Sequence, residues 1–156
     1  MRYFAYGSNL NKKHMMWRCK NAKDLGVYTL EGYQLTFRYY ADIIPMEGQS
    51  VIGGLWEITT DDEVSLDKYE GYPELYRKHT QDGIMFYYMR DDTRGLELPA
   101  HGYLEGMLEG MEHFDLPPIE TLNHNLGNPP MDNKAFIGDQ VETSIRLIAD
   151  SLGLTL

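Results

Sequence analysis

The order of two hydrophobic periodicities along the chain is the feature that most restricts its fold. Residues 32–40 alternate apolar and polar side chains with the period of two that is typical of a β-strand. From Gly102 onward, apolar residues recur at three- and four-residue spacing, which is typical of helices. Strands therefore dominate the first part and helices the last. Because no segment repeats at a fixed period, we expect one α+β domain over residues 1–156 with a largely antiparallel or mixed sheet.

Turn and capping residues divide the rest of the sequence into further elements. Gly53-Gly54 indicates a β-bulge or a close backbone approach inside a strand, Asp82-Gly83 indicates a hairpin turn, and residues 91–100 are typical of an exposed connection. We expect strands at 2–6, 50–58, 76–80 and 83–90, and helices at 11–19, 59–70, 102–114, 116–125 and about 141–152.

Charge and composition exclude several classes of partner. Twenty-four acidic residues against 14 basic ones give a net charge of -10, which repels a phosphate backbone and an anionic membrane surface. No run approaches the roughly 20 apolar residues of a spanning helix, and the N-terminus lacks a signal pattern. A single cysteine, Cys19, forms no internal disulfide. We therefore expect a cytoplasmic protein that binds neither nucleic acid nor membrane.

The segment Tyr6-Gly7-Ser8-Asn9-Leu10 is the first candidate site. It follows the first predicted strand directly, and successive backbone N–H groups in such a turn can form a nest for an anion such as a carboxylate. An Asn/Ser turn that only satisfies its own backbone explains the same residues. Local sequence leaves both interpretations open.

Glu70 is the second candidate. It lies at the end of a predicted helix, between an aromatic residue and Gly71-Tyr72-Pro73. A carboxylate facing a partly apolar pocket there has its pKa raised toward neutrality, which suits general acid/base chemistry. A solvated glutamate at a helix end is the alternative.

Other residues point to chemistry less specifically. Tyr76 is a candidate hydrogen-bonding residue in a pocket and Trp56 a candidate lining residue, although core packing explains both. Cys19 with His14 would be a nucleophile and base, but a spectator cysteine is the simpler interpretation. The histidines lack metal-ligand spacing and no phosphate-binding glycine motif occurs, so we expect no metal and no nucleotide.

Taken together, the two main candidates resemble a known family. Tyr6 to Leu10 near the N-terminus, combined with Leu66-Asp67-Lys68-Tyr69-Glu70-Gly71-Tyr72-Pro73 and Tyr76, is similar to the γ-glutamyl cyclotransferase-like superfamily, which includes AIG2-like proteins. The similarity continues through Pro99, Tyr103-Leu104, Gly110 and Leu116-Pro117, so it covers about residues 2–122.

The resemblance implies a fold, a site and a reaction. The fold is a small mixed β-barrel with flanking helices. Glu70 is the catalytic acid/base, and the substrate-binding residues are Tyr6, Gly7, Ser8, Asn9, Leu10 and Tyr76. The reaction is intramolecular aminolysis: the α-amino group of a small-molecule γ-glutamyl substrate attacks its own γ-carbonyl, which releases an amine or amino acid and leaves 5-oxoproline without any cofactor.

One segment departs from the family pattern. Where the family often carries a tyrosine shortly after its Gly-Leu-Pro segment, this chain has Asp115 to Thr121, including Glu120. If Glu120 faces the pocket, it favours a cationic leaving amine, although surface exposure also explains it. A non-catalytic small-molecule or peptide-binding module on the same fold is therefore an alternative function, and a purely structural or protein-interaction role is a third.

Overall fold

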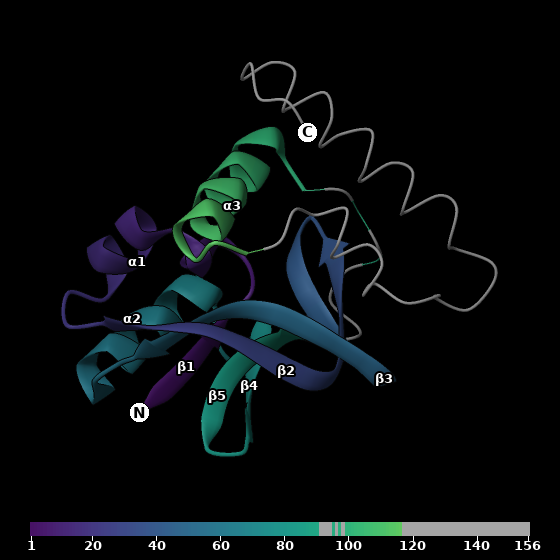
Figure 1. Cartoon of the computed structure of the whole chain (residues 1–156), viewed down its shortest axis with the longest axis horizontal. Helices are drawn as coiled ribbons and strands as arrows, with labels where there is room; N and C mark the ends of the chain where they lie inside the picture. The colour runs from purple at the N-terminus through teal and green to yellow at the C-terminus, as the bar shows by residue number, and fades with distance from the viewer. Residues whose placement is uncertain (91–94, 96, 98, 117–156) are drawn as a thin grey trace.

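The computed structural model describes residues 1–90, 95, 97 and 99–116 (Figure 1). Its elements, in chain order, are β1 (Arg2–Ala5), a 3₁₀ turn η1 (Ser8–Leu10), α1 (Lys12–Arg18), β2 (Lys23–Arg38), β3 (Tyr40–Glu57), α2 (Thr60–Glu70), β4 (Tyr76–Gln81), β5 (Ile84–Met89) and α3 (His101–His113). The α+β class is therefore confirmed. The helix predicted at 141–152, all but the first residue of the helix predicted at 116–125, and the departing residues 117–121 lie outside the described residues.

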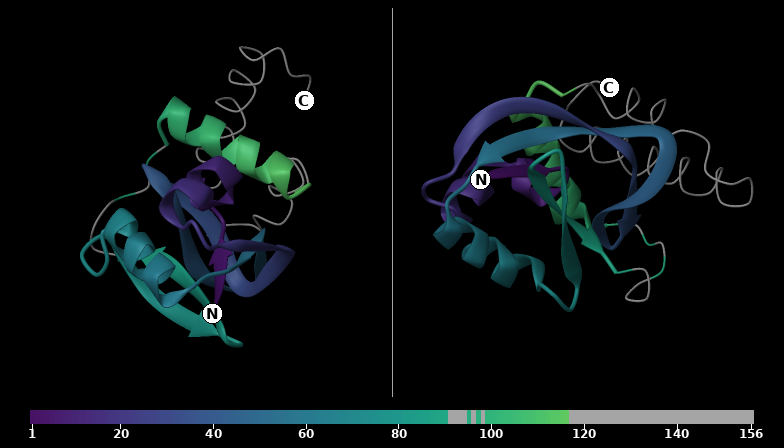
Figure 2. Two further views of the ribbon diagram at one scale, coloured as in Figure 1. Left: turned by 90° about the vertical axis from the view of Figure 1, so that its left-hand side faces the viewer. Right: turned by 90° about the horizontal axis from the view of Figure 1, so that it is seen from below.

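The five strands form one mixed sheet in the order β2-β3-β1-β5-β4. β1 runs antiparallel to β3 and parallel to β5. The long β2–β3 hairpin curves over the rest of the sheet (Figure 2). As a result, the two edge strands approach each other, and the Gln81 side chain on β4 donates to the carbonyl of Glu31 on β2 at 3.2 Å. The sheet is not closed by a strand ladder, but this curvature is compatible with a small barrel.

The hairpin is much longer than the sequence periodicity predicted. The expectation of a strand at residues 32–40 missed its first nine residues, because register shifts between Asp24 and Gly26 and between Glu31 and Tyr33 break the alternation. The chain reverses at Tyr39, which has a positive φ of 70°. A shorter hairpin follows between β4 and β5, and there Asp82 and Gly83 both have the positive φ that the Asp-Gly pair predicted.

Gly53 and Gly54 mark a close approach, whereas the bulge alternative is wrong for this pair. A Cβ atom at Gly53 would lie 2.2 Å from the carbonyl oxygen of Ala5, and one at Gly54 would lie 2.5 Å from the Phe114 ring. Any side chain here would force β1 or the end of α3 away from the sheet. The pair therefore lets both elements pack directly on β3.

Helix α2 begins and ends as its sequence predicted. The Thr59 side chain accepts from the Asp62 amide, and the Asp62 carboxylate accepts from the Thr59 amide, which completes a capping box. Gly71 ends the helix in the left-handed conformation. These two signals fix the last residue of the helix, Glu70, at the end that faces the N-terminal loop.

Helix α3 packs against that loop through a glycine. A Cβ atom at Gly110 would lie 2.4 Å from the backbone of Leu10 and Asn11, so the helix touches the main chain itself. Figure 1 places α1 and α3 on the same side of the sheet, and both helices contact η1. Within the described ranges, no helix combines the length and apolar character needed to cross a bilayer.

Candidate functional site

A small pocket opens where the C-terminal end of β1, the end of α2 and the start of α3 meet. Its empty space is about 280 Å³, including the part that opens to solvent. The pocket is lined by Tyr3, Tyr6, Gly7, Ser8, Asn9, Ala41, Glu70, Tyr76, Tyr87 and Tyr103. Six of these residues are among the seven that the sequence singled out.

The exception is Leu10. Its side chain is buried in the core, and its amide donates to the carbonyl of Gly7 at 3.0 Å in the 3₁₀ turn. The Asn11 amide likewise donates to the Ser8 carbonyl at 3.2 Å. Part of the loop therefore satisfies its own backbone. The Asn9 amide takes no part in these two bonds, and Asn9 lines the pocket.

Glu70 lies half-buried beside the loop and is held by Asn9. The Asn9 side-chain Nδ2 donates to Glu70 Oε1 at 2.8 Å. Burial away from water raises the pKa of Glu70 to about 7, against the opposing effects of the Arg18 charge and the Asn9 hydrogen bond. A carboxyl group with this pKa exchanges a proton readily near neutral pH.

Five of the ten residues that line the pocket are tyrosines, and each hydroxyl has a defined partner. Tyr3 accepts from Asn9 Nδ2 at 2.9 Å, and Tyr6 donates to the Tyr87 carbonyl at 2.8 Å. Tyr87 donates to Asp67 Oδ1 at 2.7 Å, while Tyr103 accepts from the Ala41 amide at 3.1 Å. Burial raises the pKa of Tyr103 above its ordinary value, so the phenol stays protonated at neutral pH.

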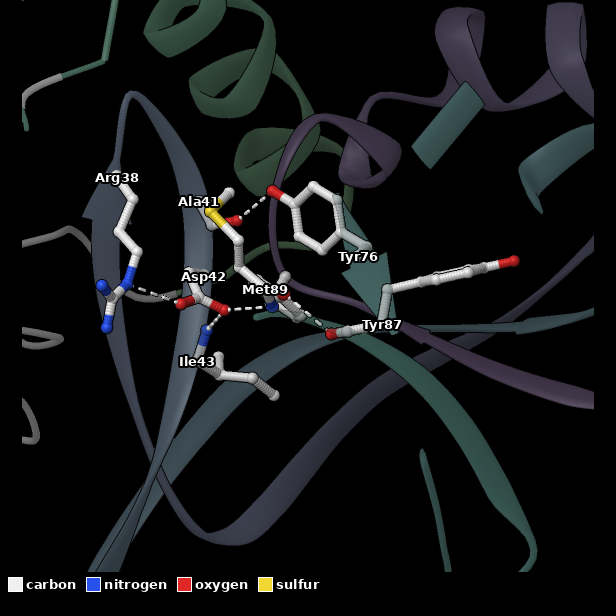
Figure 3. A network of polar contacts seen from close by, with 8 residues as sticks. Arg38, Ala41, Asp42, Ile43, Tyr76, Tyr87 and Met89 are labelled. Atoms are coloured by element: carbon white, nitrogen blue, oxygen red, sulfur yellow. Dashed lines mark hydrogen bonds and ion pairs between the residues drawn. The ribbon is translucent and has the colours of Figure 1, made fainter. Parts of the chain in front are cut away.

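The back of the pocket is braced by the start of β3 (Figure 3). Tyr76 donates to the carbonyl of Ala41 at 2.6 Å, so the backbone of Ala41 holds one pocket tyrosine through its oxygen and another, Tyr103, through its nitrogen. The adjacent Asp42 is fully buried and accepts from the amides of Ile43 and Met89 at 2.8 and 2.7 Å. Asp42 thereby ties β3 to β5, although these strands are not neighbours in the sheet.

Trp56 lies behind the loop and not in the pocket, as the core-packing interpretation predicted. It is completely buried, and its Nε1 donates to the Asn9 carbonyl at 3.1 Å. Cys19 is buried as well, and burial raises the pKa of its thiol to about 12, which opposes thiolate formation. His14 is exposed beside Gly106 of α3. The nucleophile interpretation of Cys19 is therefore wrong.

Sequence reasoning missed the remaining pocket residues. Tyr3, Tyr87 and Tyr103 come from β1, β5 and α3, and only the strand register and the packing of α3 bring them together. A Cβ atom at Gly7 would lie 2.6 Å from the Tyr103 hydroxyl, so this glycine is what allows the contact. Arg18 was missed too: its Nη1 donates to Asn9 Oδ1 at 2.7 Å.

Metal-ligating groups do not gather at this pocket. In the part of the chain that the structure describes, no group of three or more histidine, cysteine, aspartate or glutamate side chains is arranged to hold a metal ion. What the described site offers is one titrating carboxyl group, several phenols and the loop backbone.

Comparison with known proteins gives a family from the sequence and a similar fold among solved structures. The family model described as "Gamma-glutamyl cyclotransferase, AIG2-like" matches residues 3–105. A solved structure named "Gamma-glutamyl cyclotransferase" is 24% identical with a TM-score of 0.68, over 94% of this chain and 98% of that one.

Two uncharacterized proteins are also similar in structure. One from Homo sapiens is 24% identical with a TM-score of 0.63, over 93% of this chain and 97% of that one. One from Pyrococcus horikoshii is 26% identical with a TM-score of 0.52, over 72% and 98% of the two chains. No curated protein matches the sequence.

Proposed function

The chain belongs to the gamma-glutamyl cyclotransferase, AIG2-like family, and from this premise we propose that it cyclises a γ-glutamyl group to 5-oxoproline with Glu70 as the acid/base. The observation that carries the proposal is the position of Glu70: a half-buried carboxyl group with a pKa raised to about 7, held by Asn9 against the loop that lines the same pocket. Both candidates from the sequence thus contribute to one small cavity.

The proposed reaction needs one group that first takes a proton and then returns it. The α-ammonium of a bound γ-glutamyl compound has no lone pair, so Glu70 as carboxylate removes one proton from it. The resulting amine attacks the γ-carbonyl carbon and forms the new C–N bond of the five-membered ring. The original γ-amide C–N bond breaks as Glu70 returns the proton to the departing nitrogen. The ring nitrogen loses a second proton on becoming the lactam N–H, and Glu70 passes this proton on in the same way, so the amine leaves as an ammonium ion. The products are 5-oxoproline and a free amine or amino acid.

Binding accounts for much of the expected rate. An open γ-glutamyl chain samples many conformers, and fixing both ends places the amine near the carbonyl before any bond forms. We assign the substrate's α-carboxylate to the Gly7–Asn9 side of the pocket. The candidate donors there are the Asn9 amide, which takes no part in the two bonds of the turn, and the Ser8 hydroxyl. Tyr6, Tyr76 and Tyr103 form the wall against which the carbon chain lies. Leu10 supports the turn from the core and makes no contact with the ligand.

The experiment is a product assay with matched variants. Purified protein is incubated with a panel of γ-glutamyl amino acids and γ-glutamyl amines, and both 5-oxoproline and the released amine are measured. We expect equal amounts of the two products from the wild type. Glu70→Gln, which keeps the shape but not the titration, should lose about a hundredfold or more in kcat, the size of a general acid/base contribution.

Glu74→Gln is the matched control. Glu74 is an exposed glutamate four residues further on and does not line the pocket, so its loss should leave turnover unchanged. Turnover that survives in Glu70→Gln would contradict the mechanism. Binding of a γ-glutamyl compound without turnover of any substrate would instead favour the non-catalytic binding module.

A further inference from the structure

Hydrogen bonds connect Arg18 to Glu70 through one intervening side chain, that of Asn9. Among the described residues, no other cation has such a connection to Glu70. Arg18 is the last residue of α1, and its Nη1 donates to Asn9 Oδ1 at 2.7 Å. Asn9 in turn donates from Nδ2 to Glu70 Oε1 at 2.8 Å and to the Tyr3 hydroxyl at 2.9 Å. The three side chains come from α1, the loop and α2, so the connection joins three elements at one side of the site.

Arginine can only donate hydrogen bonds, and this decides how the Asn9 amide is oriented. A guanidinium facing Asn9 requires the carbonyl oxygen on its side, which directs both amide hydrogens toward Glu70 and Tyr3. Without that donor, the rotated amide would present its oxygen to Glu70, which suits only the protonated acid. Arg18 therefore holds Asn9 in the one orientation that serves an ionised Glu70.

As a consequence, the two carboxylate oxygens of Glu70 differ in their hydrogen bonding. Oε1 always receives a hydrogen from Asn9, whereas Oε2 has no partner among the described residues although Glu70 lines the pocket. A proton arriving at the carboxylate therefore binds to Oε2. That oxygen is the one left for exchange with a ligand.

The position of Arg18 is itself held from the opposite side. Its guanidinium carbon lies 3.5 Å from the centroid of the Tyr69 ring, and the Tyr69 hydroxyl lies 3.1 Å from Ser8 Oγ. Tyr69 precedes Glu70 on α2, so the contact joins α1 to the same helix end that carries the acid/base.

Placing the Arg18 guanidinium here costs folding free energy, and packing alone does not explain why an arginine occupies the position. Arg18 Nε is buried and has no hydrogen-bond partner in the described residues, and an unsatisfied buried donor destabilises a fold. An apolar side chain of the same length would cover Tyr69 without this penalty. Local rules are most often broken in this way at functional sites.

We propose that Arg18 is a positioning residue which, through Asn9, orients Glu70 so that Oε1 is always hydrogen-bonded and Oε2 alone moves protons. This proposal rests on the proposed role of Glu70 as acid/base. The positive charge also favours the carboxylate, in agreement with its lowering effect on the pKa of Glu70. Arg18 makes no contact with the substrate in this account.

The test measures Glu70 directly, so that it does not depend on turnover. Full-length protein with ¹³C-labelled glutamate is titrated by NMR, with the Glu70 carboxyl signal assigned from Glu70→Gln. Arg18→Met keeps the apolar stem over Tyr69 but removes the donor and charge, and it should raise the pKa of Glu70 by about half a pH unit or more. Arg18→Lys still donates to Asn9 and should return most of the shift.

Lys12→Met is the control, because Lys12 is an exposed cation on the same helix that does not line the pocket. The Lys12→Met substitution should leave the pKa of Glu70 the same as in the wild type. In the product assay, Arg18→Met should lower kcat by about tenfold or more with little change in KM, and Arg18→Lys should recover activity. The thermal midpoint of each variant verifies that it is folded.

Two results would overturn the positioning role. One is an Arg18→Met protein whose Glu70 titrates as in Lys12→Met. The other is equal impairment by methionine and lysine, which would indicate packing. If no γ-glutamyl substrate turns over but the titration shifts as expected, the proposed function fails while the Arg18–Asn9–Glu70 coupling stands.

Discussion

Glu70 is held by a neutral amide and not by a direct ion pair, and this difference sets its chemistry. A carboxylate that is paired with arginine keeps a low pKa and is a poor proton carrier near neutral pH. Here the Arg18 charge acts through Asn9, and burial outweighs it, so the pKa of Glu70 is raised from 4.5 to about 7. One side chain can therefore take and return a proton without a large free-energy penalty in either direction.

The raised pKa also predicts how stability depends on pH. Between pH 4.5 and about 7 the native state binds a proton at Glu70 that the unfolded chain releases, so this group's contribution to stability falls as pH rises. At about 1.4 kcal/mol per pH unit, the loss approaches about 3 kcal/mol above pH 7. Glu70→Gln should therefore gain stability relative to wild type between pH 4 and pH 8, measured by urea unfolding. A constant difference across that range would contradict the buried, titrating Glu70.

A second prediction concerns Gly7 and the effect of adding a single Cβ atom there. The Gly7 φ of -123° is accessible to any residue, so the constraint is the space beside it: a Cβ atom would lie 2.6 Å from the Tyr103 hydroxyl. Gly7→Ala should displace Tyr103 from the pocket wall and lower kcat/KM for γ-glutamyl substrates by about tenfold or more. Tyr103→Phe in the same background should relieve part of the clash. Unchanged kinetics in Gly7→Ala would mean that ligand binding does not use this side of the pocket.

Among the elements, α3 shows how helix packing supports the loop. Gly110 touches the backbone of Leu10 and Asn11, whereas Gly102 on the same helix is exposed, and a Cβ atom added there would have nothing within 4 Å. Substitutions at these two glycines therefore distinguish the effect of helix propensity from the effect of contact with the loop.

Replacing each glycine by alanine tests that difference. Gly102→Ala should be neutral or stabilising by up to about 1 kcal/mol, because alanine is the better helix former. Gly110→Ala should destabilise by about 1–3 kcal/mol, because the helix must move off the loop, and it should lower activity as well. Chemical unfolding gives both values. Equal effects of the two substitutions would show that α3 does not brace the loop.

The elements also show what could be predicted from sequence and why the rest could not. Local signals sufficed for α2, where Thr59 and Asp62 form the capping box and Gly71 ends the helix. The first half of β2 was missed because its register shifts hide the period of two. Tyr87 and Tyr103 were missed for a different reason: their place in the pocket depends on the register of β5 and on the packing of α3, and neither is encoded by neighbouring residues.

For the molecule as a whole, the excess of acidic residues acts on stability through long-range repulsion. A net charge of -10 on one small chain disfavours the compact state at low ionic strength. Raising NaCl from about 10 to 200 mM shortens the screening length from roughly 30 Å to below 10 Å, and we expect the thermal midpoint to rise by a few degrees. A midpoint that falls with salt would mean that attractive pairs, such as Lys78 with Glu63 and Asp67, outweigh the repulsion.

At this scale, sequence and structure contribute different parts of the account. The motif pair at Tyr6 to Leu10 and at Glu70 was enough to indicate the family, which the match over residues 3–105 confirms. The structure adds that the loop and Glu70 meet in one pocket, and that Leu10 stands outside it. The single-domain expectation for residues 1–156 and the individual site roles stay predictions.

The measurement that tests the central claim most directly is the pH dependence of kcat/KM for the best γ-glutamyl substrate of the panel. This ratio reports the ionisation of the free enzyme, in which Glu70 must be a carboxylate to take the ammonium proton. Because the pKa of Glu70 is raised to about 7, we predict that kcat/KM is constant above that pH and falls tenfold per pH unit below it. A profile that stays flat down to pH 5 would contradict Glu70 as the base.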